Sequence, residues 1–148
     1  GGATAGAVAV AIGNKNGEYC FMTVHPNLQR ACDRALDELM LDIKGIKAVV
    51  VSTEDGFEVA ARVENTAQIA RLSAMASSLA ALGAMAGEES QLGVCESIVM
   101  QAAEGFIAIT QVRRADVSLI VSVVTGRDAV TGQVLYFSKK AAKSLQDA

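Results

Sequence analysis

Hydrophobic residues at three- and four-residue steps predict a helix that begins after Pro26. Its apolar positions are Leu28, Ala31, Cys32, Ala35, Leu36, Leu39, Met40 and Ile43. Charged residues lie between them, so the helix has one face for a core and one for water. Gly45 is placed to end it, because glycine readily takes the backbone conformation that closes a helix.

Two strands and a tight turn follow. Residues 47–53 are apolar on both faces, which predicts a central strand that is covered on both sides. Asp55-Gly56 predicts a hairpin turn, because glycine supplies the positive φ that such a turn needs. Residues 57–62 alternate: Phe57, Val59 and Ala61 on one face, Glu58, Ala60 and Arg62 on the other. That pattern predicts an edge strand with one face in water.

Residues 94–102, 106–112 and 117–124 predict three more strands, and their short connections indicate an antiparallel meander. A last helix is expected over 131–146. The order helix, two strands, helix, three strands, helix predicts one α+β domain over residues 26–148, with a five-stranded antiparallel sheet between helices. Residues 1–25 form an N-terminal arm, either a short hairpin that turns at 13–17 or a flexible segment.

The long helix expected over 65–87, capped by Asn65 or Thr66, carries Arg71 as its only charged side chain. A helical wheel separates two faces. We expect the large residues to pack on the sheet: Ile69, Leu72, Met75, Leu79 and Leu82. The opposite face is small and would allow two backbones to approach closely: Ala67, Ala70, Ala74, Ser77, Ala81 and Ala84.

Three explanations fit this uncharged helix. It can be buried inside a monomer, it can enter a membrane, or its small face can meet a second copy across a two-fold axis. The apolar part is short for a membrane span and rich in Ser, Ala and Gly. We favour the dimer, because two-fold pairing is the commonest way to bury such a stripe.

The segment "ALDELMLDIKGIKAVVVSTEDGFEVAARV", the Ala/Leu/Met/Ser helix after it and the three-strand meander together resemble the roadblock / dynein light-chain family. The resemblance covers residues 28–146. It implies the roadblock (profilin-like) architecture and a homodimer with paired central helices and sheets joined edge to edge. Cys95, Ser97 and Val99 would then lie in the interface. It also implies a role in scaffolding or regulating small Ras-like GTPases or motor complexes.

Charge, cysteine spacing and the N-terminal stretch argue against several other classes of protein. The net charge of −3 gives no electrostatic reason to expect nucleic acid as a partner. Cys20, Cys32 and Cys95 are widely spaced and form no disulfide framework, which indicates free thiols in a reducing, cytoplasmic compartment. The apolar stretch near the N-terminus is too short for a membrane span and lacks the basic residues of a signal peptide.

Candidate chemistry is sparse. The sequence contains neither a phosphate-binding G-x-x-x-x-G-K-[ST] loop nor G-x-G-x-x-G after a strand. His25, the only histidine, could pair with Cys20 or Cys32 as a nucleophile, or join both in a zinc site, but the spacing matches no common ligand pattern. A capping or surface role for His25 and packing roles for Cys32 and Cys95 are the simpler interpretation. We therefore expect no catalytic residue, cofactor or metal.

Arg113-Arg114 follows a predicted strand and could bind an acidic partner surface, and Arg71 and Ser78 are further candidates for partner contact. The residues Lys139, Lys140 and Lys143 solubilise the last helix. The sequence thus predicts a non-enzymatic, homodimeric regulator or scaffold that binds a Ras-like small GTPase or its assembly. The alternative is a sensor domain that encloses a small molecule between sheet and helix.

Overall fold

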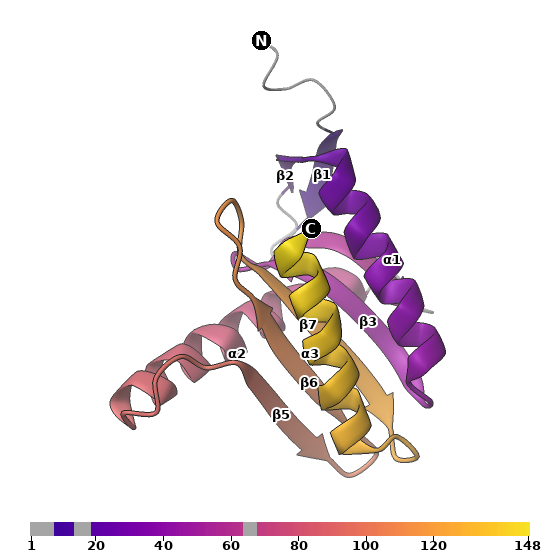
Figure 1. Cartoon of the computed structure of the whole chain (residues 1–148), viewed down its shortest axis with the longest axis vertical. Coiled ribbons are helices and arrows are strands. Elements are labelled where there is room, and N and C mark those ends of the chain that lie inside the picture. Colours follow the sequence, from indigo (N-terminus) through magenta and orange to yellow (C-terminus); the bar gives the residue numbers. More distant parts are fainter. Residues whose placement is uncertain (1–7, 14–18, 64–67) are drawn as a thin grey trace.

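A computed structural model describes residues 8–13, 19–63 and 68–148, and over these residues it contains three helices and two antiparallel sheets (Figure 1). The helices are α1 (Pro26–Asp42), α2 (Ile69–Glu89) and α3 (Thr131–Asp147). The larger sheet runs in the order β4 (Glu58–Val63), β3 (Ile46–Thr53), β7 (Leu119–Gly126), β6 (Gly105–Val112), β5 (Ser97–Ala102). The predicted order of elements is confirmed, and β3 is an interior strand covered on both faces, as predicted.

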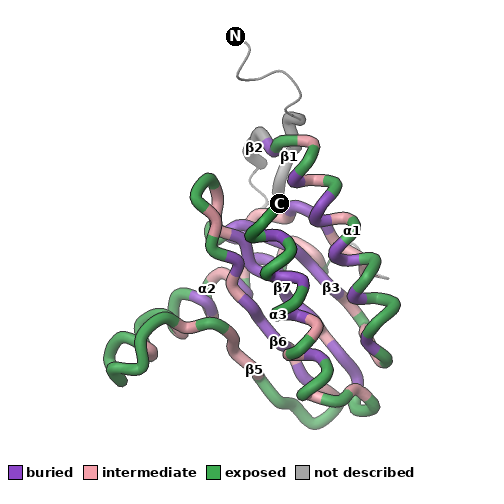
Figure 2. Tube along the Cα trace, viewed as in Figure 1, coloured by how far each residue is buried: buried purple, intermediate pink, exposed green. Residues whose placement is uncertain are grey.

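The main hydrophobic core lies between the sheet and the helices α1 and α3, which cover the same face (Figures 1 and 2). Leu36 and Leu145 enter it from the two helices, and Val49 and Val121 enter it from the sheet, each with 0% of its surface exposed. Burying one such side chain stabilises the fold by about 1.5–3 kcal/mol. This side of the domain is therefore a closed, conventionally packed core.

The first helix begins and ends where its sequence indicates. His25 is the N-cap, and its Nδ1 accepts a hydrogen bond from the Asn27 N–H at 3.1 Å, while Pro26 fills the first turn. The helix ends at Asp42, and Gly45 turns the chain into β3 at φ +87°. A side chain at Gly45 would also collide with Asp128, whose Oδ1 lies 2.7 Å from the position of an added Cβ.

The other face of the sheet is covered by α2, mostly through small side chains, with Leu72 buried and Leu79 partly buried beside them. The buried residues of α2 are Leu72, Ser73, Ala76 and Ala80, and the two alanines pack on Ile109 and Ile120. Our expectation that the large residues of α2 face the sheet is wrong for Met75 and Leu82, which are 53% and 60% exposed. Small residues on the buried side of the helix allow its backbone to lie close to the sheet.

Strand β4 forms one edge of the sheet, as predicted, but neither of its faces is fully open to water. Helix α1 contacts one face and α2 the other. Val59 and Ala60 are both buried, Glu58 is half-buried, and burial raises the pKa of the Glu58 carboxyl. The expectation of one face in water is wrong because helices cover both faces of this edge strand. The register of β3 against β4 also shifts between Val51 and Ser52.

A second, two-stranded sheet precedes α1. Strand β1 (Val8–Gly13) pairs antiparallel with β2 (Tyr19–Val24), with Val8 opposite Val24 and Gly13 opposite Tyr19. This arrangement corresponds to the hairpin alternative for the N-terminal arm. The turn that we predicted at residues 13–17 lies outside the described residues apart from Gly13.

Candidate functional site

Helix α2 is longer than the sheet that it crosses. Its 21 residues span about 31 Å, whereas five strands are about 19 Å apart from first to last. The helix contacts all five strands of the sheet, yet from Ala81 to Glu89 none of its residues is buried. Figures 1 and 2 show this C-terminal part of α2 extending beyond β5, with its residues exposed.

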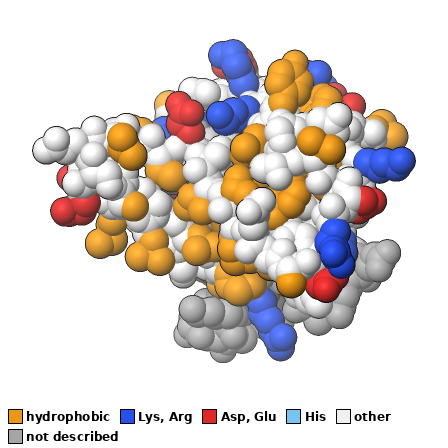
Figure 3. Space-filling model, turned by 90° about the horizontal axis from the view of Figure 1, so that it is seen from below, with side chains coloured by type: hydrophobic (Ala, Val, Ile, Leu, Met, Phe, Trp, Pro, Cys, Tyr) orange, Lys and Arg blue, Asp and Glu red, His pale blue; other side chains and the backbone are white. Residues whose placement is uncertain are grey.

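The projecting part of the helix is apolar. Leu82 and Met85 are 60% and 61% exposed, and the chain after the helix adds Leu92 and Val94, which are 83% and 66% exposed. Hydrophobic side chains cover much of this side of the molecule, with few charges among them (Figure 3). We call the exposed side chains Met75, Leu82, Met85, Leu92, Val94 and Met100 the apolar surface. Contiguous exposed hydrophobic groups of this kind mark interaction sites.

A groove of ≈ 840 Å³ lies between the C-terminal half of α2 and the start of β5. Glycines set the spacing beside it: a Cβ added to Gly83 would lie 2.6 Å from Ile98 and 2.9 Å from the Cys95 sulfur. A Cβ on Gly87 would lie 2.5 Å from the Gly93 carbonyl oxygen. These contacts fix how the projecting helix leaves the sheet, and they place Cys95 against α2 of its own chain.

Strand β5 is the second edge of the sheet, and its outer backbone groups are accessible for pairing. The Gln111 N–H donates to the Glu96 carbonyl, so alternate residues of β5 bond to β6. By this alternation the N–H groups of Ser97, Val99 and Gln101 point away from β6. Such a row of edge donors and acceptors is a template for another strand.

The small residues that we predicted as a dimer seam have different surroundings along the helix. Ala81 and Ala84 are exposed, whereas Ala70, Ala74 and Ser77 are half-buried. A Cβ on Gly56 would lie 3.3 Å from the Ala74 Cα, and Ser77 Oγ donates to the Glu54 carbonyl. Small side chains at 74 and 77 thus serve close contact with the β3–β4 turn of the same chain. Ala67 lies outside the described residues.

The predicted partner-binding residues also differ from one another. Arg71 and Ser78 are exposed on α2 and border the apolar surface, and Arg113 is exposed and donates to the Cys95 carbonyl at 3.2 Å. Arg114 instead makes hydrogen bonds within its own chain. Its side chain is only 11% exposed and donates to both Asp116 carboxylate oxygens, at 2.8 and 3.1 Å, and to the Leu145 and Ala148 carbonyls.

The candidate catalytic groups do not come together in the described part of the chain. His25 is occupied as the helix cap, which confirms that interpretation. Cys32 is fully buried, and burial raises the pKa of its thiol to about 12, so it is not a nucleophile at neutral pH. No group of three metal-ligating side chains occurs among the described residues. The side chain of Cys20 lies outside them.

Helix α2 is, over the described residues, the one helix long and apolar enough to span a membrane by length and composition, with 22% of that stretch buried. Its side chains nevertheless pack on Ile109 and Ile120 of the sheet. The exposed apolar residues follow the opposite side of the helix. The helix therefore has one side packed on the sheet and one apolar side that is exposed.

Comparison with solved structures identifies the fold. The chain is similar to a Roadblock/LC7 domain from Streptomyces avermitilis, with a TM-score of 0.70 and 19% identity over 78% of this chain and 94% of that one. It is also similar to the gliding protein MglB from Thermus thermophilus, with a TM-score of 0.72 and 14% identity over 84% and 92% of the two chains. An MglB with a tetrameric arrangement matches with a TM-score of 0.70 and 17% identity, over 81% and 88%.

The protein therefore has the Roadblock/LC7 fold, as its sequence resemblance predicted. No family model matches the sequence. No curated protein matches it either. Among the residues of the site, the sequence indicated Met75 and Leu82 but assigned them to the sheet. It placed Val94 and Met100 in the strand expected over 94–102, and it did not indicate Met85 or Leu92.

Proposed function

We propose that the protein is a non-enzymatic homodimer that regulates or scaffolds a Ras-like small GTPase in the cytoplasm. The observation that carries the proposal is the apolar C-terminal part of α2, which projects past the sheet with Leu82 and Met85 exposed. An isolated protomer would keep this surface in water at a cost of about 25 cal/mol per Å² of apolar area. A second copy that covers it would remove that cost.

The open edge of β5 supports the same interface. It adjoins the apolar surface through Val94 and the groove beside Gly83. Pairing of two β5 strands would satisfy the outward amides of Ser97, Val99 and Gln101 and would join the sheets edge to edge. We propose Cys95, Ser97 and Val99, together with the exposed residues of α2, as the interface.

The GTPase partner is proposed from the fold and from local charge. Similar folds occur in MglB, a gliding protein. The resemblance of residues 28–146 to roadblock proteins implies a GTPase or its assembly as partner. Arg113, Lys139 and Lys143 line a groove of ≈ 360 Å³, to which Glu96 contributes the one acidic side chain among its lining residues. An acidic partner surface would complement this basic groove.

The test uses the full chain in two steps. Proteins captured from extract of the source cell are identified by mass spectrometry, and a captured GTPase is then purified and loaded with GDP or a non-hydrolysable GTP analogue. We expect direct binding that depends on the nucleotide and a changed rate of hydrolysis or exchange. Lys143→Glu should weaken binding while the homodimer persists, because Lys143 lines the basic groove but not the groove beside Gly83. Absence of direct binding to any captured GTPase would refute the GTPase assignment.

The alternative function, a small-molecule sensor, has one feature in its favour. A groove of ≈ 730 Å³ lies beside the first half of α2 and is lined by apolar residues together with Lys47, Gln68 and Arg71. This volume suits a small ligand. Native mass spectrometry of the purified protein separates the two functions, since a retained metabolite of defined mass would favour the sensor.

A further inference from the structure

The groove beside the first half of α2 has an apolar floor that the strand register sets. Ala48 of β3 lies opposite Val63 of β4 on one side and Val124 of β7 on the other, so they form one row across three strands. All three line the groove and are half-buried. One row further along β3 and β7, Val50 lies opposite Ser122, and both are fully buried beneath α2. The helix therefore leaves the row of Ala48 only partly covered.

A bulge in β3 brings Lys47 to this groove. Side chains alternate along a strand, and Val49 enters the core beneath α1 and α3, so a regular strand would place Lys47 on that side as well. The register of β3 against β7 instead shifts between Ile46 and Ala48, and Lys47 lines the groove. Its Cε lies 3.4 Å from the position of a Cβ on Gly126, which is on the α2 side by the alternation of β7. Bulges commonly redirect a side chain toward a site.

Two cations lie at this groove without an opposite charge. Lys47 and Arg71 are exposed, and none of the described residues that line the groove is acidic. Neither cation forms an ion pair with another described residue. Asp128 also approaches Gly126, but it does not line the groove. Arg71 is in the first turn of α2, where the helix dipole favours anions and which carries no acidic residue. A bound anion would compensate both cations.

We propose that this groove binds a small amphipathic carboxylate. Its apolar chain lies on the row of Ala48 and against the buried Leu72, and its carboxylate contacts Lys47 and Arg71. The volume of ≈ 730 Å³ suits a small ligand, and such sites are mostly apolar with a few polar groups that orient the ligand. Arginine is suited to this contact because its guanidinium can donate two parallel hydrogen bonds to a carboxylate.

The groove is separate from the proposed interface. Its floor belongs to β4, β3 and β7, and β6 separates β7 from the open edge of β5. The site rests on the small-molecule alternative proposed above, to which it adds a ligand class, and it needs neither the homodimer nor the GTPase. Ligand binding can therefore be measured on the full chain in either association state.

The test is a titration of the isotope-labelled full chain with octanoate, hexanoate and 1-octanol, followed by the NMR shifts of backbone amides. We expect octanoate to shift the amides of Ala48, Val63 and Leu72. Two further CH₂ groups in an apolar groove should make octanoate bind at least about fourfold more tightly than hexanoate. Without a carboxylate, 1-octanol should bind about fivefold more weakly than octanoate at low salt, and the difference should shrink at high salt.

Substitutions separate the two parts of the site. Lys47→Gln with Arg71→Gln should weaken octanoate about fivefold and leave 1-octanol unchanged, because it removes only the charges. Ala48→Leu places a larger side chain on the floor and should weaken both ligands at least about tenfold. Lys44→Gln with Lys140→Gln is the matched control, since both lysines are exposed and neither lines the groove. We expect it to leave octanoate binding within about twofold. Thermal melting checks that each variant is folded.

The possible failures are distinguishable. Absence of octanoate binding, or amide shifts confined to residues away from the groove, overturns the site. Equal octanoate affinity in the double variant and its control overturns the carboxylate contact, as does equal affinity of wild type for octanoate and 1-octanol. Neither result bears on the homodimer or the GTPase. A metabolite that the purified protein retains and octanoate does not displace would overturn this ligand class and leave the sensor function in place.

Discussion

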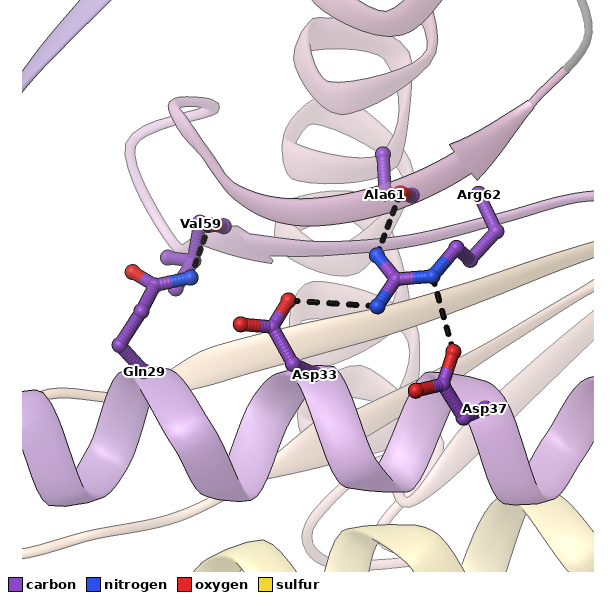
Figure 4. A network of polar contacts seen from close by, with 6 residues as sticks. All are labelled: Gln29, Asp33, Asp37, Val59, Ala61 and Arg62. Atoms are coloured by element: carbon purple, nitrogen blue, oxygen red, sulfur yellow. Dashed lines mark hydrogen bonds and ion pairs between the residues drawn. The ribbon is translucent and has the colours of Figure 1, made fainter.

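The two outer strands of the sheet, β4 and β5, have opposite surroundings. At β4 the outward carbonyls are already bonded: Gln29 Nε2 donates to Val59 at 2.9 Å, and Arg62 donates to Ala61 at 2.8 Å (Figure 4). Arg62 also pairs with Asp37 at 3.0 Å and Asp33 at 3.5 Å, which ties β4 to α1.

At β5 the situation is reversed. Met100, Gln101 and Ala102 are exposed, and the neighbouring α2 projects with Leu82 and Met85 uncovered. Unpaired edges invite association unless charge or side-chain contacts block them. One edge is thus closed by its own side chains, and the other remains available to a partner.

The largest effect on the dimer dissociation constant should follow from charged substitutions in the apolar surface of α2. Met75→Glu combined with Met85→Glu would bury unpaired carboxylates in the proposed interface, at a cost of several kcal/mol. The dimer dissociation constant should rise more than about a thousandfold. Val130→Glu with Tyr136→Glu is the control, since both residues are exposed and apolar but belong to the other side of the domain. Light scattering after gel filtration gives the mass of each. Equal dimer content in both double variants would contradict the comparison.

Proline at the edge of β5 should have an intermediate effect. Ser97→Pro and Gln101→Pro each remove an outward N–H without removing a bond to β6. If two β5 strands pair, dimer affinity should fall about tenfold for each, because a backbone bond is lost on both sides of the two-fold axis. Protomer stability should fall less for Gln101→Pro, whose side chain is exposed. An unchanged dissociation constant for both variants would show that the sheets do not join there.

A substitution at β4, the closed edge, should lower the stability of the protomer and leave the dimer dissociation constant unchanged. Arg62→Met removes the contacts to Asp33, Asp37 and the Ala61 carbonyl, all partly exposed. We expect the free energy of unfolding to fall by about 1 kcal/mol, as for a small surface network. Urea denaturation measures that loss, and sedimentation should show the wild-type dissociation constant. Dimer loss in this variant would mean that β4 also contributes to the interface.

The sequence predicted the fold well because hydrophobic period and turn chemistry are local signals. Helix α1, the Asp55-Gly56 turn and the meander are all readable from spacing alone. Spacing alone does not show which side of α2 packs on the sheet. The buried side of α2 holds Ser73, Ala76 and Ala80 beside Leu72, and its outer side holds Met75 and Leu82. Side-chain size therefore gave the wrong side for Met75 and Leu82. The charges of Arg71 and Glu89 on one side of the helix were the available signal, because ionised groups favour the exposed side.

The smallest effect concerns the link between the β6–β7 connection and α3. A hydrogen bond from Arg114 lowers the pKa of the Asp116 carboxyl below its ordinary value of 3.8. A carboxyl with a lowered pKa in the folded state stabilises the protein above its unfolded pKa, and this contribution is lost as the pH falls below about 4. Asp116→Asn should therefore be less stable than wild type at pH 7, by under about 1 kcal/mol because the Asp116 side chain is 58% exposed, and the difference should shrink as the pH falls below 3.8. A difference that persists at low pH would exclude the ion pair as its cause.

The most direct measurement compares two neighbouring positions on the outer side of α2. Leu82 belongs to the apolar surface, whereas Ala81 belongs to the small face with Ala74 and Ser77, which we call the small stripe. Both Leu82 and Ala81 are exposed. Sedimentation equilibrium of Leu82→Glu and Ala81→Glu shows which side of the helix controls association. We predict that Leu82→Glu is monomeric and that Ala81→Glu remains a dimer with a dissociation constant within about tenfold of wild type. A monomeric Ala81→Glu beside a dimeric Leu82→Glu would contradict the proposed contact and restore the small stripe as the seam.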